Sequence, residues 1–130
     1  MRILLDTHIV LGILGRELAE RYPEIERGLA DPTATGFVSV ASLWEIAIKT
    51  RLGKLDPGVP LPDIAGYLDA LGFVILPIHA SHAAAAADPE PPTRDPFDRL
   101  LLAQCQVEGL RLATNDRALK DHRLAMRISG

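Results

Sequence analysis

The fold of this chain is constrained most by an alternation of short, continuously apolar runs with longer segments of helical periodicity. A run such as Ile3-Leu4-Leu5 indicates a strand that is buried on both faces, because neither face has to meet water. Strands that alternate with helices form mostly parallel sheets with helices on both faces. The sequence therefore predicts a three-layer α/β/α domain with strands at 3–5, 37–40, 73–78 and 111–114, and a fifth, edge strand at 126–129.

The expected helices follow from the spacing of apolar residues and from the glycines that end them. Gly53, Gly72 and Gly109 stop three of these helices. Two proline-rich stretches, 57–62 and 88–96, are too short to be domain linkers, and 130 residues is an ordinary size for one domain. We therefore expect a single domain over residues 1–130, with helices at 17–29, 41–52, 63–71, 79–87 and 97–108 and a helical turn at 116–120.

Charge and cysteine content exclude several classes of protein. With 14 Lys and Arg against 17 Asp and Glu, the net charge is −3, which argues against a protein that holds nucleic acid by bulk charge alone. It does not exclude an enzyme that meets phosphate through a metal ion. The single cysteine, Cys105, rules out an intrachain disulfide and a multi-cysteine zinc site. No apolar run approaches the roughly 18–20 residues of a membrane span, and no targeting segment is visible, so we expect a cytoplasmic protein.

Acidic residues occur where the expected strands end. Asp6 follows the first strand directly, and Asn115 and Asp116 follow the fourth. In open parallel sheets, binding sites form beyond the carboxyl ends of the strands. These residues can therefore meet at one edge of the sheet, although they come from opposite ends of the sequence.

The helix expected at 41–52 can add a carboxylate to the same edge. Glu45 shares a stripe with Ser42 and Lys49, because positions three and four apart face the same way on a helix. The apolar side of this helix, which we expect to pack inside the protein, consists of Trp44, Ala47, Ile48 and Leu52.

The helix expected at 97–108 contributes Asp98. This residue lies above the apolar positions Leu101, Leu102 and Cys105, so we expect its carboxylate to point along the buried side of the helix and Cys105 to belong to the core. A buried carboxylate needs a partner, since burial of an unpaired charge is costly.

Four carboxylates, Asp6, Glu45, Asp98 and Asp116, can thus converge. Like charges held close together repel one another, and a hard divalent cation removes that repulsion. Mg²⁺ and Mn²⁺ prefer oxygen ligands, lower the pKa of a bound water and orient a phosphate. The arrangement therefore suits hydrolysis of a phosphodiester.

Each acid also has a purely structural explanation. Asp95 matches a helix N-cap followed by proline, and Asp98 then sits where an acid interacts favourably with the helix dipole. Asp116 can cap a following turn, and Glu45 can form a surface ion pair with Lys49. Only the joint placement of the four acids favours a site.

Four motifs lie in order along nearly the whole chain: Leu-Leu-Asp-Thr-His at 4–8, Ser-Leu-Trp-Glu-Ile-Ala-Ile-Lys at 42–49, Arg-Asp-Pro-Phe-Asp-Arg-Leu-Leu-Leu-Ala-Gln at 94–104 and Leu-Ala-Thr-Asn-Asp at 112–116. In these motifs the sequence resembles a PIN domain of the VapC toxin type, the ribonuclease of bacterial toxin–antitoxin pairs. The resemblance implies a PIN-like fold, commonly a homodimer, with RNA as substrate. It also implies a small antitoxin protein that binds near the active site and blocks it.

By this resemblance the four acids form the active site. Asp6 and Asp98 would hold Mg²⁺ directly, and Asp116 would ligate the same ion or a second one. Glu45 would bind metal or water, and Mn²⁺ could replace Mg²⁺. His8 lies where the family varies and receives no catalytic role. The residues expected to support the acids are Thr7, Ser42, Thr114 and Asn115.

The resemblance implies a Mg²⁺-dependent endoribonuclease that acts as a toxin and hydrolyses RNA through metal-bound water. Arg94, Arg99 and Arg117 lie beside the acids and could contact phosphates, or could be solvated surface charge. Two alternatives stay open. One is a catalytically inactive PIN scaffold that only binds a partner. The other is a receiver-type phosphoacceptor domain, which normally needs an acidic pair after its first strand, where this chain has the single Asp6 before Thr7.

Overall fold

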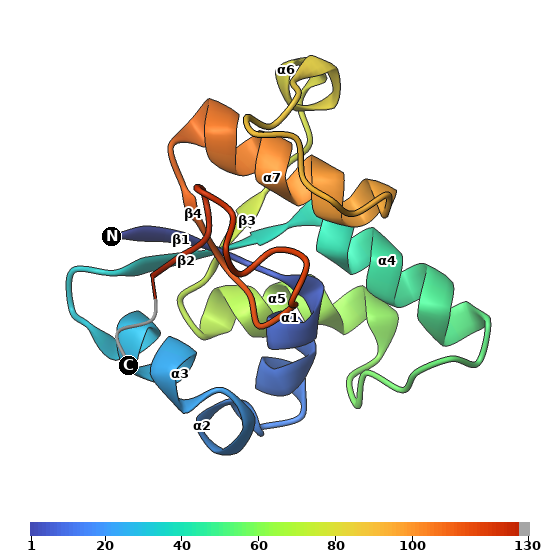
Figure 1. The fold of residues 1–130 in the computed structure, drawn as a ribbon. Coiled ribbons are helices and arrows are strands. Elements are labelled where there is room, and N and C mark those ends of the chain that lie inside the picture. Colours follow the sequence, from blue (N-terminus) through green and yellow to red (C-terminus); the bar gives the residue numbers. More distant parts are fainter. Residues whose placement is uncertain (128–130) are drawn as a thin grey trace.

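Four strands form one sheet in the order β3-β2-β1-β4, and all neighbouring strands run parallel (Figure 1). The computed structural model describes residues 1–127. The strands are β1 (Arg2–Leu5), β2 (Thr35–Ser39), β3 (Val74–Leu76) and β4 (Arg111–Ala113). The helices are α1 (Thr7–Leu14), α2 (Leu18–Arg21), α3 (Pro23–Ala30), α4 (Val40–Arg51), α5 (Ile64–Ala70), α6 (Ala80–Ala84) and α7 (Pro96–Glu108), with a 3₁₀ turn, η1, at Leu61–Asp63.

The side chains of β1 show why the fold has three layers. Successive residues of a strand point to opposite faces of the sheet. Ile3 and Leu5 belong to one apolar cluster, completed mainly by α1, α3 and α5, whereas Leu4 belongs to a second cluster completed mainly by α7. Figure 1 shows α7 on one side of the sheet and α1, α3 and α5 on the other. The predicted α/β/α arrangement is confirmed, and the described sheet is entirely parallel.

The order of the strands places a switch in direction at β1. The chain adds β2 and β3 on one side of β1 and then returns to add β4 on the other side. Crossover helices diverge at such a point, which leaves room beyond the carboxyl ends of the strands. The backbone N–H of Asp6 donates to the carbonyl of Ala113 at 3.0 Å, so the segments that follow β1 and β4 start side by side.

The helix α4 presents a different face to the protein than the sequence predicts. Trp44 is 60% exposed and Leu52 is 63% exposed, so the prediction that Trp44 packs inside is wrong. A carboxylate faces inward instead, because Thr7 and Lys49 provide hydrogen bonds to Glu45. The buried residues of α4 are Ala41, Ser42, Glu45 and Ile46.

Several boundaries also differ from the expected ones. The segment 17–29 forms two helices, since Pro23 cannot continue α2 and begins α3 instead. The helix α6 is shorter than the expected 79–87. The helical turn expected at 116–120 is present, since the backbone N–H of Lys120 donates to the carbonyl of Asp116 at 2.9 Å. No strand forms at 126–127, although Ala125 makes an isolated bridge to Leu112, and the rest of the expected edge strand lies outside the described residues. Among residues 1–127, none of the helices combines the length and the apolar character that crossing a membrane requires.

Candidate active site

Asp6 follows β1 and serves as the N-cap of α1. Its Oδ1 accepts the backbone N–H of His8 at 3.3 Å, and its Oδ2 accepts the hydroxyl of Thr114 at 2.6 Å. Asp6 is only 3% exposed. Burial raises the pKa of Asp6, and the nearby charge of Asp116 raises it further, whereas the hydrogen bonds from Thr114 and His8 lower it; the balance is a raised pKa. The cap of α1 therefore also holds a buried carboxylate at the edge of the sheet.

Thr114 joins the acids that follow β1 and β4. Its hydroxyl donates to Asp6, and its oxygen accepts the backbone N–H of Asp116 at 3.1 Å. The Oδ1 of Asp116 accepts the N–H of Ala118 at 2.8 Å, so this acid does cap the following turn, as the structural explanation expects. Within residues 1–127 no donor reaches its Oδ2, which leaves one oxygen of Asp116 available to a ligand.

Glu45 reaches the same region from α4 and is 6% exposed. Its Oε1 lies 2.7 Å from the hydroxyl of Thr7, which in turn lies 2.9 Å from the hydroxyl of Ser42. The Nζ of Lys49 donates to Oε2 of Glu45 at 2.6 Å, and this bond is the main reason why the pKa of Lys49 is raised. The expected pair of Glu45 and Lys49 exists, but its carboxylate is buried rather than on the surface.

Asp98 lies in the first turn of α7 and has no such support. Asp95 caps this helix by accepting a backbone N–H of the first turn at 2.9 Å, as the sequence predicts. Among residues 1–127, no hydrogen-bond donor reaches the Asp98 carboxylate. Burial, together with the negative charges of Asp95, Asp6, Asp116 and Glu45, raises the pKa of Asp98 to about 7. Asp98 is therefore a carboxylate without a hydrogen-bond donor, in a region where acids outnumber the one nearby cation, Lys49, whose pKa Asp98 helps to raise.

The four acids thus share one electrostatic environment at the carboxyl ends of β1 and β4. A hollow of about 180 Å³ opens there, and neither Glu45 nor Asp98 belongs to its lining. In the part of the chain that the structure describes, no three His, Cys, Asp or Glu side chains are already drawn together as a metal-binding cluster. The donor set fits a hard cation, because carboxylate oxygens are its preferred ligands and it would neutralise the repulsion that raises these pKa values. The hollow is lined by Asp6, His8, Tyr22, Asn115 and Asp116.

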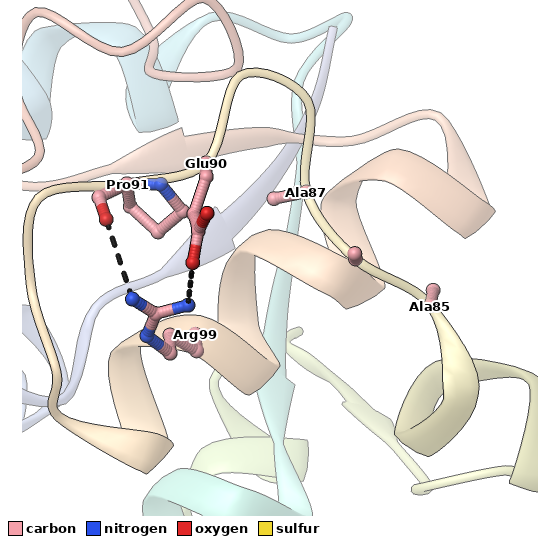
Figure 2. A pocket seen from close by; sticks show the side chains of 6 residues that line it. Ala85, Ala87, Glu90, Pro91 and Arg99 are labelled. Carbon is pink, nitrogen blue, oxygen red and sulfur yellow. Dashed lines mark hydrogen bonds and ion pairs between the residues drawn. The ribbon is translucent and has the colours of Figure 1, made fainter.

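Arg99, one of the three arginines expected to contact phosphate, is held by the loop before α7. Its Nη1 donates to the carboxylate of Glu90 at 3.0 Å, and its Nε donates to the carbonyl of Thr93 at 2.8 Å. Figure 2 shows the guanidinium turned toward Glu90 and Pro91, beside a cavity of about 280 Å³. Arg99 therefore fixes this loop, whereas Arg94 and Arg117 are exposed.

Two aromatic residues lie near the acids without having been expected there. Tyr22 lies between α2 and α3 and lines the hollow. The sequence predicts one continuous helix over 17–29, and that expectation does not predict this position for Tyr22. Trp44 lies on the surface with its ring centroid 5.8 Å from that of Phe97, in an edge-to-face arrangement. In the sequence, the ring pair is indicated only by position: Trp44 directly precedes Glu45, and Phe97 directly precedes Asp98.

Comparisons with known proteins agree with the fold. A search of curated proteins found no match. Among solved structures, the chain is similar to one in the crystal structure of VapBC2 from Rickettsia felis bound to a DNA fragment from their promoter. The identity is 17% and the TM-score 0.62, over 97% of this chain and 96% of that chain, and at this identity the likeness shows the fold alone. The family model described as the PIN domain matches residues 3–123, which is nearly the whole chain. The chain therefore belongs to the PIN domain family.

Proposed function

We propose that this chain is a metal-dependent endoribonuclease and the toxin of a toxin–antitoxin pair. The proposal is carried by one observation: at the switch point of the sheet, Asp6, Glu45 and Asp116 lie close enough to Asp98 for their charges to raise its pKa. Such a crowd of carboxylates is unfavourable unless a cation neutralises it. Membership of the PIN family, whose members are typically nucleases, supports the same activity and sets aside the receiver-type alternative.

In this proposal Asp6, Asp98 and Asp116 hold Mg²⁺, or Mn²⁺ in its place, and Glu45 binds the ion or a water beside it. When bound, such an ion lowers the pKa of a water and stabilises the charge that develops on a phosphate. The chain itself supplies the orientation of the ligands. Thr114 fixes one oxygen of Asp6. Within residues 1–127, no donor reaches either oxygen of Asp98 or the Oδ2 of Asp116. No side-chain nucleophile is needed.

The partners that we propose are an RNA substrate, a small antitoxin protein that covers the site, and a second copy of the chain. The antitoxin is supported by the likeness of this fold to a chain of a VapBC2 complex. The exposed Arg94 and Arg117 stand near the acids in sequence and are suited to contact RNA phosphates.

Cleavage of labelled RNA by the purified protein in Mg²⁺ tests the proposal. Asp6→Asn and Asp98→Asn should each lower the rate by about 100-fold or more, as expected when a group that stabilises charge in the transition state is removed. Asp69→Asn, an exposed acid on α5, is the matched control and should cleave at the wild-type rate. Unchanged cleavage by Asp98→Asn would overturn the proposal. An intact wild-type protein that neither cleaves RNA nor binds Mn²⁺ in calorimetry would be the inactive scaffold instead.

A further inference from the structure

Trp44 and Phe97 form an aromatic pair at the place where α4 and α7 meet. The two helices pack side by side (Figure 1), and the rings meet edge to face with an interplanar angle of 71°. Each ring precedes one of the proposed catalytic acids in sequence, Glu45 on α4 and Asp98 on α7. The same crossing of α4 and α7 brings Glu45 close enough to Asp98 for its charge to raise the pKa of Asp98, so the aromatic pair lies where these two acids also approach each other.

The indole of Trp44 is exposed although large aromatic side chains are normally buried. Exposing 60% of a tryptophan leaves a large apolar surface in water, which is unfavourable unless a ligand covers it. Phe97 is half-buried and meets the indole edge to face, so it supports one side of the Trp44 ring. The indole is thus held in place while much of its surface stays accessible.

One arginine on α4 and one in the loop before α7 carry positive charge on either side of this pair in the sequence. Arg51 is exposed and lies seven residues after Trp44, which places it on the same face of α4 about 10 Å along the helix axis. Arg94 is exposed and precedes Phe97 by three residues. A single-stranded nucleic acid offers flat bases and negative phosphates in alternation, so aromatic rings between cations complement it.

We propose that Trp44, supported by Phe97, stacks an unpaired base of the RNA next to the bond that is cleaved. The inference rests on the proposed function and deepens it, because it assigns a base-binding role to two residues outside the four acids. Proteins that read RNA by sequence or structure bind mainly unstacked bases, which stack on exposed aromatic side chains. A base in the interior of a duplex is already stacked on both faces and cannot use this platform.

The fluorescence of Trp44 tests the inference directly, since the chain has one tryptophan. The Asp98→Asn variant is used so that the RNA stays intact. In Mg²⁺ it is titrated with a single-stranded uridine hexanucleotide, with the same oligomer lacking its bases, and with a blunt RNA duplex. The hexanucleotide should quench the emission, and the oligomer without bases and the duplex should not.

Variants on the same background separate stacking from other uses of this face. Trp44→Ala and Trp44→Phe lack the only tryptophan, so their binding is measured by the anisotropy of a labelled hexanucleotide. Trp44→Ala should raise the Kd for the hexanucleotide about 10-fold, the loss expected for one stacked base, while Trp44→Phe should keep most of the affinity. Leu52→Ala is the matched control, because Leu52 is an exposed apolar residue of the same face but lies two turns away. It should bind RNA as tightly as the parent protein.

A face that binds a second copy or another protein would give different results. Emission that changes with protein concentration alone, or binding that Trp44→Ala and Leu52→Ala weaken equally, would overturn the inference. RNA cleavage by the wild-type chain with an unchanged KM in Trp44→Ala would overturn it as well, and would leave the proposed function standing. Quenching by the hexanucleotide in a protein that cleaves no RNA would support the platform and contradict the proposed nuclease.

Discussion

Replacing Asp98 with asparagine should stabilise the metal-free protein even though it should abolish cleavage. The pKa of Asp98 is raised from 3.8 to about 7, first by burial and then by the charges of neighbouring acids. Between these two values the folded chain binds more protons at this position than the unfolded chain does. The free energy of unfolding therefore falls as the pH rises from about 4 to about 7, and stays low at higher pH. Asparagine has nearly the same shape and carries no charge at any pH.

The size of the effect follows from the same pKa. Each tenfold change in proton affinity is worth about 1.4 kcal/mol, so the upper bound at pH 8 is about 4 kcal/mol. Asp98 is only half-buried, and solvent screens its repulsion by the neighbouring acids. We therefore expect Asp98→Asn to gain about 1–2 kcal/mol at pH 8, on the scale of partly exposed charges. For a domain of this length the gain corresponds to an increase in Tm of about 3–10 °C.

Urea unfolding in EDTA measures this gain. Asp98→Asn should exceed the wild type clearly at pH 8 and by less at pH 5, where the wild-type carboxyl is still protonated in the folded chain. Asp69→Asn, which removes an exposed acid far from this cluster, should match the wild type at both values. Adding Mg²⁺ should stabilise the wild type more than Asp98→Asn. Equal stabilities of Asp98→Asn and the wild type at pH 8 would refute the reasoning.

Three further substitutions test contacts around the site and in the sheet. Thr114→Val removes a buried hydrogen bond to a carboxylate, so urea unfolding should show a loss of about 1.5–3 kcal/mol. The pKa of Asp6 should rise further, which would move the acid limb of the pH–rate profile to higher pH. Arg99→Ala releases the loop before α7, and limited proteolysis should cut that loop faster than in the wild type. Gly36→Ala would bring a Cβ within 2.6 Å of the Phe73 ring, and thermal unfolding should show a loss of about 1–3 kcal/mol from overpacking.

The sequence by itself determined the elements that depend on local rules. The apolar run of β1 predicts a strand buried on both faces, and Ile3 and Leu4 do lie in separate apolar clusters. Asp95 caps α7 as its position before proline predicts. The placement of Asp6 directly after a strand also follows from the sequence. Asp6 is the single residue between the end of β1 and the start of α1, so it lies at the carboxyl edge of the sheet.

The tertiary structure decided which face of α4 is buried. A helical period fits two stripes of this helix, one with Trp44 and Leu52 and the other with Ser42 and Glu45, and apolarity alone favours the first. The second is buried because Thr7 at the start of α1 and Lys49 satisfy the carboxylate. A buried polar group needs such partners, and the partner on another element is not visible in the periodicity of α4.

The tertiary structure alone also decided which acids have hydrogen-bond partners. Thr114 and Asp6 are 108 positions apart and meet only because β4 pairs with β1. Arg99 pairs with Glu90 at the surface, on a loop whose path no local rule predicts. Sequence patterns specify where a residue lies on its own strand or helix. The partners that a charge finds are set by how the strands and helices pack, and this packing separates the supported Asp6 from the unsupported Asp98.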